Sequence, residues 1–263
     1  MKISYIKATL WVAFFFLITI LSFIGFNRKE ANYDFKNLAD KKNTAMQIQT
    51  QSEFESTLKN IGSSTNVVKP DVLNSNDTNR LLLSIQLLDT MKQYLYAGVL
   101  AERLAKIQNN DSRYLQAARF YLMELYKHDE SSNELMLTKK SKENLEKCLT
   151  LNPNNLDAKV DLAVCVYNLN KMQTPEDQMD LMKPALLLRE VIAVDSNHLD
   201  GLYYLGKLAV ESNQFEKAIV RFKKLVSLQP QNREFYLELS QIYAMMGNKE
   251  ESKLWENKAQ SIK

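Results

Sequence analysis

The sequence predicts an all-α protein, in which one N-terminal transmembrane helix precedes a superhelix of paired helices. Three observations support this fold class. The chain has only 6 Gly and 5 Pro among 263 residues, and strand-rich folds need many such turn residues. Apolar residues recur at helical spacing from residue 77 onward. A similar phrase, an apolar helix end followed by a break and polar residues, occurs at 149–155, 192–198 and 226–232.

The first predicted element is a membrane anchor at residues 8–26, after a short N-terminal tail of residues 1–7. The stretch carries no charged residue, and as a helix it would reach about 28 Å, enough for the hydrocarbon core of a bilayer. The alternative is a cleaved signal peptide, which has a shorter apolar region and a small-x-small cleavage site. The exit sequence SFIGFNRK lacks that site, so we expect an uncleaved anchor.

The orientation of this anchor has two interpretations. More Lys and Arg follow the apolar stretch than precede it, so the positive-inside rule taken literally keeps the large domain in the cytoplasm. A short N-terminus is also typical of a signal anchor that exports the domain C-terminal to it. We expect an exported C-terminal domain.

Residues 27–76 are predicted to form a polar tether with one short helix. Lys, Asn, Gln, Ser and Thr dominate the region, and Phe54, Leu58 and Ile61 form one apolar helical stripe that ends at Gly62. The tether would hold the following domain away from the membrane.

Residues 77–263 are predicted to be a domain of repeated helical hairpins. Pro153 and Ser196 are 43 residues apart, and Ser196 and Pro230 are 34 residues apart; a 34-residue period of paired helices is typical of tetratricopeptide repeats. The best match spans residues 199–232, where the pattern is supplied by Leu202, Leu205, Gly206, Ala209, Ala218, Phe222, Leu225 and Pro230. Ala209 departs from the pattern, which has Tyr there.

The sequence therefore resembles the tetratricopeptide-repeat (TPR) family over roughly residues 77–263. The resemblance implies about four repeats, the first degenerate, with hairpins near 77–110, 111–155, 156–198 and 199–232 and a capping segment at 233–263. The hairpin at 156–198 carries an insert around KMQTPEDQM, in which Thr174 is interpreted as the N-cap of a lengthened helix.

The repeat register also implies structural roles. We expect Gly206 at the crossing of two helices with Ala218 as its small counterpart, and Phe222 between hairpins. Leu202 and Leu205 are expected in the core. Pro230, like Pro153 in the earlier phrase, follows a second helix and stops it, because Pro lacks an N–H and clashes with the preceding turn.

The stretch GLYYLGKL, residues 201–208, spaces two glycines and a lysine as a phosphate-binding loop does. Leu208 stands where that loop has Ser or Thr, and the bulky flanking residues favour a helix. We therefore interpret the stretch as a repeat helix, in which Gly201 has no particular role.

The sequence predicts no enzyme, cofactor or metal site. It lacks H-E-x-x-H, C-x-x-C and G-x-G-x-x-G motifs, and its two histidines lie far apart; His198, in an inter-repeat turn, is expected to be solvated. Members of a catalytic triad need not be adjacent in sequence, but nothing suggests one. Cys148 and Cys165 are expected to be buried thiols, with a single disulfide as the alternative in an oxidising compartment.

The predicted partners are proteins. The net charge is +3 with lysines interspersed among acids, so there is no nucleic-acid footprint, and no small-molecule substrate is expected. In the TPR family the first helices line a concave groove, and the corresponding polar and aromatic residues here are Asp157, Tyr167, Asn168, Asp200, Tyr203, Lys207, Glu211, Glu234 and Gln241. Val160 and Val164 occupy groove positions where the family's carboxylate-binding members have Lys and Asn.

The resemblance is to short bacterial TPR proteins with an N-terminal anchor. It implies a single-pass protein of the bacterial inner membrane, with its C-terminal domain in the periplasm, that serves as an interaction scaffold. The alternative is an accessory subunit or assembly factor of an envelope complex, such as one for outer-membrane or cytochrome biogenesis. An enzyme is the third hypothesis.

Overall fold

The structure is a computed structural model that describes residues 70–127, 134–172 and 182–262. All regular secondary structure in these ranges is helical, as predicted. A four-residue helix, α2 (Pro70–Leu73), precedes ten longer helices. These are α3 (Thr78–Thr90), α4 (Tyr94–Gln108), α5 (Asp111–Lys127), α6 (Glu134–Leu151), α7 (Leu156–Met172), α8 (Lys183–Val194), α9 (Leu199–Glu211), α10 (Phe215–Leu228), α11 (Arg233–Met245) and α12 (Lys249–Ser261).

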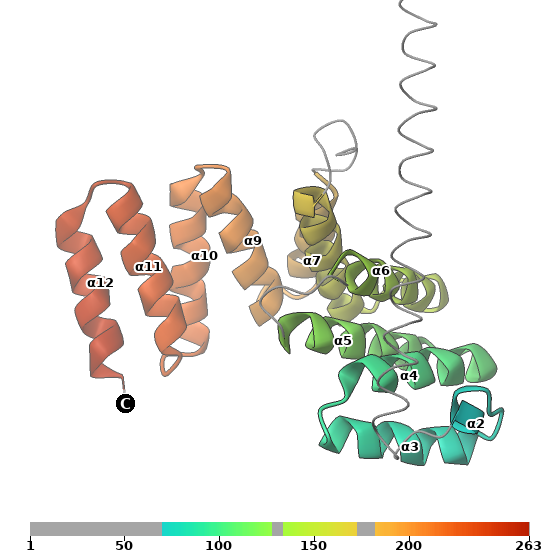
Figure 1. Cartoon of the computed structure of the whole chain (residues 1–263). Helices are drawn as coiled ribbons and strands as arrows, with labels where there is room; N and C mark the ends of the chain where they lie inside the picture. Colours follow the sequence, from blue (N-terminus) through green and yellow to red (C-terminus); the bar gives the residue numbers. More distant parts are fainter. Residues whose placement is uncertain (1–69, 128–133, 173–181, 263) are drawn as a thin grey trace, which may run out of the picture. The chain divides into compact units, whose positions relative to one another are not determined.

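From α3 to α12, each helix packs against the next one along the chain (Figure 1). Short turns join α3 to α4, α9 to α10 and α11 to α12, and in each turn one residue has a positive φ: Lys92, Asn213 and Gly247. Short connections of this kind make consecutive helices antiparallel neighbours. The predicted all-α architecture of paired helices is confirmed for this part of the chain.

Three predicted elements fall outside the described residues. These are the membrane anchor at 8–26, the short helix that contains Phe54, and the helix start at Thr174. In the part that the structure describes, no helix is both long and apolar enough to cross a bilayer. The anchor therefore stays a prediction from sequence.

Polar residues cap the first helices of successive hairpins. Asn110 accepts from the backbone N–H of Arg113 at the start of α5, and Asn155 accepts from that of Ala158 in α7. Asn232 accepts from the N–H of Glu234 at the start of α11. Each cap satisfies a helix N–H that has no partner within the helix. The polar residues that end the recurring phrase therefore serve as helix caps.

His198 is a further cap, at α9, and the expectation that it is solvated was wrong. Its Nδ1 accepts from the N–H of Gly201 at 3.2 Å, and its Nε2 lies 3.4 Å from Asp157 Oδ1 on α7. Its side chain is only 13% exposed. The ring therefore links two hairpins instead of facing water.

The core of the last two hairpins is built around Phe222. Its ring is fully buried, and it lies against Gly206, where an added Cβ would come within 2.8 Å of the ring. Gly206 therefore lies at a helix crossing as expected, but the group that needs its space is Phe222 of the same hairpin, not Ala218. Leu202, Leu205 and Ala218 are all buried.

Gly201 was also wrongly interpreted. It is buried, and a Cβ there would lie 3.0 Å from a methyl group of Val191 on α8. The glycine allows α9 to approach α8 closely. The whole stretch 201–208 lies within α9, as the helical interpretation predicts.

The proline residues follow the helices that they were expected to end. α6 ends at Leu151 before Pro153, and α10 ends at Leu228 before Pro230. Pro230 also offers its carbonyl oxygen to the Tyr236 hydroxyl at 2.9 Å.

The core of the earlier helices contains a buried polar group. Glu102 of α4 accepts a hydrogen bond from Tyr121 of α5 at 2.9 Å and pairs with Lys106 and, at 3.7 Å, with Lys140 of α6. Burial raises the pKa of Glu102, but these hydrogen bonds and positive charges outweigh it and hold the pKa below its usual value. The carboxylate is therefore a paired, ionised part of this core.

Candidate functional site

A cavity of about 350 Å³ lies among α5, α7, α8 and α9. Aromatic and aliphatic side chains make much of its wall, with a few polar groups among them, as in many ligand-binding sites. The lining residues are Tyr126, Ala163, Val164, Tyr167, Asn168, Lys171, Pro184, Leu188, Tyr204, Lys207, Leu208 and Glu211. We call this cavity the groove site, because it contains four of the predicted groove residues.

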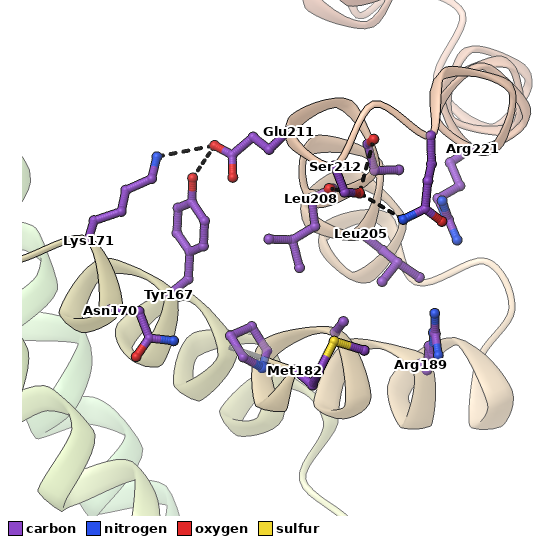
Figure 2. Close-up of a pocket in the computed structure, with 14 residues that line it drawn as sticks. Tyr167, Asn170, Lys171, Met182, Arg189, Leu205, Leu208, Glu211, Ser212 and Arg221 are labelled. Carbon is purple, nitrogen blue, oxygen red and sulfur yellow. Dashed lines mark hydrogen bonds and ion pairs between the residues drawn. The ribbon is translucent and has the colours of Figure 1, made fainter. Parts of the chain in front are cut away.

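One edge of the groove site is a cluster of Tyr167, Lys171 and Glu211. The carboxylate of Glu211 on α9 accepts a hydrogen bond from the Tyr167 hydroxyl on α7 and lies 3.1 Å from Lys171 Nζ (Figure 2). The ammonium of Lys171 also lies 4.3 Å from the centre of the Tyr167 ring. Burial and the hydrogen bond to Glu211 raise the pKa of Tyr167, so its hydroxyl keeps its proton and remains a donor.

Tyr203 and Lys207 are held by residues of the next hairpin. The Tyr203 hydroxyl donates to Glu234 on α11 at 2.9 Å, and Lys207 Nζ contacts both carboxylate oxygens of Glu238 at 2.9 and 3.1 Å. Burial and the hydrogen bond to Glu234 raise the pKa of Tyr203. These groups are preorganised, and the charge of Lys207 is already neutralised. Tyr203 and Lys207 are therefore not available to bind the carboxylate of a partner.

Asp157 belongs to an ion-pair network between hairpins. Arg119 of α5 contacts Asp157 at 3.1 Å and Asp161 at 2.8 Å. Burial lowers the pKa of Arg119, but the hydrogen bonds and charges of Asp161 and Asp157 outweigh it and raise the pKa. With His198 on its other side, Asp157 links α5, α7 and α9.

The remaining groove candidates differ in their surroundings. Asn168 lines the groove site and hydrogen-bonds with Tyr126. Asp200 and Gln241 are exposed on α9 and α11. Their role as partner contacts stays a prediction.

The groove positions of Val160 and Val164 are buried, at 2% and 8% exposure. Val160 packs with Ala163, Leu188 and Leu205 in the core between α7, α8 and α9. Its expected exposure in the groove was wrong, because α9 covers this part of α7. Val164 is one of the residues that line the groove site.

A second cavity, of about 550 Å³, lies between α7 and α8 on one side and α9 and α10 on the other (Figure 2). It shares Tyr167, Lys171, Pro184, Leu208 and Glu211 with the groove site. Its other lining residues include Met182, Arg189, Leu205 and Arg221. We call it the inter-hairpin cavity.

Sequence reasoning missed several residues of these cavities, namely Tyr126, Lys171, Pro184, Arg189, Tyr204 and Arg221. The repeat register assigns groove contacts to fixed positions in the first helix of each hairpin. The missed residues lie at other positions of those helices or in the second helices. The tyrosines carry some signal, since Tyr is enriched in binding surfaces. Arg189 and Arg221 are far apart in sequence, so only the packing of both α8 and α10 against α9 brings them to one cavity.

The described residues hold no group of three or more His, Cys, Asp or Glu that could bind a metal ion. Cys148 and Cys165 are buried free thiols, which confirms the first of the two predictions for them. Burial raises their pKa values, to about 11 for Cys148 and about 12 for Cys165. Neither is a reactive thiolate near neutral pH.

Comparison with known proteins supports the repeat architecture. No family model matches the sequence. A protein of Bombyx mori named "Inactive peptidyl-prolyl cis-trans isomerase shutdown" is 27% identical over 124 residues, which are 47% of this chain. The match covers 26% of that protein, so the chain spans about a quarter of the relative's length.

Solved structures of TPR proteins superpose on most of the chain. A MamA structure from Desulfovibrio magneticus RS-1 has a TM-score of 0.57 at 15% identity and covers 72% of this chain and 96% of its own. Another MamA structure gives 0.53 at 19% identity, covering 67% and 92%. YrrB, described as a TPR protein with an unusual peptide-binding site, gives 0.50 at 15% identity, covering 71% and 87%. These similarities show the fold.

Proposed function

Because the chain has the tetratricopeptide-repeat fold, we propose that it is a protein-interaction scaffold that binds a segment of a partner protein in the groove site. The observation that supports this most is the cavity itself. Its aromatic walls supply apolar contact area, and its Tyr167, Lys171 and Lys207 are held by carboxylates of the next hairpin. A site of this kind suits recognition of a peptide side chain.

The side chains in and beside the groove site are preorganised for binding. Tyr167, Tyr203 and Lys207 are each held by a carboxylate from a neighbouring helix. Fixed side chains lose little entropy when a partner binds, which leaves more of the contact energy for affinity. We therefore assign the site a binding role.

The location of the scaffold is part of the proposal. Residues 8–26 would anchor the chain in the inner membrane of a bacterium, and residues 27–76 would hold the repeats away from it on the periplasmic side. The support is the uncharged length of residues 8–26 and the polar composition of the tether. Labelling of a cysteine introduced at exposed Lys249, from outside intact cells, tests the orientation; absence of labelling contradicts it.

Site-specific photocrosslinking tests the binding proposal. A photoreactive amino acid replaces Asn168 in the groove site of the full-length chain, and a control chain carries it at exposed Leu254 on α12. We expect one or a few defined protein adducts in cells from the first chain that the second does not form. Identical adduct patterns, or none at Asn168, would count against a partner in the groove.

A further inference from the structure

Arg189 and Arg221 enter the inter-hairpin cavity from α8 and α10. Figure 2 shows Arg189 projecting from α8 toward the side of the cavity on which Arg221 lies. Among the described acidic residues, none forms an ion pair with either arginine, and Nη1 of Arg221 is buried without a hydrogen-bond partner. Two cations therefore face one cavity, and one of them, Arg221, has a buried donor that no described residue satisfies.

The acid that lines the same cavity is already occupied. Glu211 is the one carboxylate among the residues that line this cavity, and it is bound by Tyr167 and Lys171. Burial lowers the pKa of Arg221, and the neighbouring positive charge of Arg189 lowers it further. Among the described residues that line the cavity, the cations Lys171, Arg189 and Arg221 therefore outnumber the single acid Glu211.

A buried donor without a partner is costly, and an anion that accepts from it removes that cost. The guanidinium group presents its donors in a fork that matches a carboxylate. We propose that the inter-hairpin cavity binds an acidic side chain, Asp or Glu, of the partner segment between Arg189 and Arg221. This proposal rests on the proposed function, because it names the chemistry of the segment that the scaffold recognises.

The walls of the cavity specify the ligand further. Met182, Pro184, Leu205 and Leu208 are apolar, and the volume of about 550 Å³ exceeds what one carboxylate fills. The bound segment therefore carries apolar residues beside its acid.

Two synthetic peptide pools test the inference with the full-length chain. One pool has a fixed Leu-Glu-Leu centre with degenerate flanks, and the matched pool has Leu-Gln-Leu. We expect the chain to retain the Glu pool about tenfold more strongly than the Gln pool, since hydrogen bonds to a charged group are stronger than those to a neutral amide. The double variant R189Q/R221Q is expected to lose this preference.

A charge-matched control is K217Q/K249Q, which removes two exposed lysines outside this cavity and is expected to keep the preference. If R189Q/R221Q loses its helical circular dichroism, R189Q alone, at an exposed residue, is expected to lose most of the preference. Equal retention of both pools by the unmodified chain, or a preference that survives in R189Q/R221Q, overturns the inference. So does stronger retention of a third pool with a phosphoserine centre.

The failure of this inference can be told apart from failure of the proposed function. Crosslinking at Asn168 reports on the groove without regard to charge. Specific adducts there, together with equal retention of the Glu and Gln pools, would remove the acidic-ligand inference alone.

Discussion

The early helices and the last two hairpins use the same packing device in different chemical settings. In the last two hairpins Gly206 makes room for the ring of Phe222, and in the early helices Gly98 makes room for the ring of Tyr121. A Cβ at either glycine would lie within 3.0 Å of the ring. Phe222 is surrounded by apolar groups, whereas Tyr121 carries a hydroxyl that reaches the buried Glu102.

The difference shows what a polar group in a repeat core requires. A buried carboxylate must be compensated by charge and hydrogen bonds. Here the compensation comes from Lys106 one turn away and from Lys140 on a third helix. The early core therefore depends on pH and on contacts among three helices, while the later core depends mainly on shape.

The largest expected effect is the loss of an aromatic ring. Phe222→Ala should destabilise the last two hairpins by about 3–5 kcal/mol, because the ring is fully buried and its removal leaves a cavity. Urea unfolding followed by circular dichroism measures the change, with exposed Val220→Ala on the same helix as the control. A loss below about 1 kcal/mol would show that the ring does not organise this core.

A smaller loss is expected from filling the space beside the rings. Gly206→Ala and Gly98→Ala should each destabilise by about 1–3 kcal/mol through overpacking, less the gain in helix propensity. In the background Phe222→Leu, the loss caused by Gly206→Ala should shrink, because the smaller side chain leaves room. An additive double variant would contradict the direct contact between Gly206 and Phe222.

The early core contains the buried carboxylate of Glu102, so its stability should depend more on pH than the stability of the later core does. Glu102→Gln should cost about 1–2 kcal/mol near neutral pH, because it removes the charge that Lys106 and Lys140 contact. Because folding lowers the pKa of Glu102, the ionised carboxylate stabilises the fold at pH values above 4.5, the usual pKa of this group. That stabilisation is lost as the pH falls through the lowered pKa. Unfolding curves between pH 7 and 3 should therefore show a weaker pH dependence in the variant; parallel curves would contradict the ionised pair.

The smallest effect concerns the turns between paired helices. Gly247 has φ of +77°, and Asn213 occupies the equivalent place one repeat earlier with φ of +56°. Gly247→Ala should cost about 1 kcal/mol from left-handed strain, while Asn213→Gly should change stability by less than about 0.5 kcal/mol. Thermal unfolding of both variants measures the two changes in stability. An equal loss of stability in both would contradict left-handed strain as the cause at residue 247.

The sequence predicted the features that repeat at fixed spacing. The paired helices, the burial of Leu202 and Leu205, and the helical state of residues 201–208 all follow from local periodicity and the repeat register. The polar residues that end the recurring phrase are helix caps in the structure, at Asn155, His198 and Asn232. Such features depend on neighbours within one or two turns or on the adjoining hairpin.

The features that were missed depend on side chains far apart in the chain. Lys207 is neutralised by Glu238, and Tyr203 is held by Glu234, at a sequence separation of 31 residues in both cases. His198 and Gly201 looked incidental because their contacts, Asp157 and Val191, belong to the preceding hairpin. The register predicts which helix face meets a neighbour, but not which group the neighbour offers.

The most direct measurement of the central claim is the affinity of the crosslinked partner for two variants of α5. Tyr126→Ala removes an aromatic wall of the groove site, and Met123→Ala removes a side chain on the same helix that does not line it. Both residues are exposed, so neither change should unfold the chain. We predict that Tyr126→Ala weakens binding about tenfold, as expected for an aromatic interface residue, while Met123→Ala leaves the affinity unchanged. Equal affinities for both variants and the unmodified chain would contradict binding in the groove site.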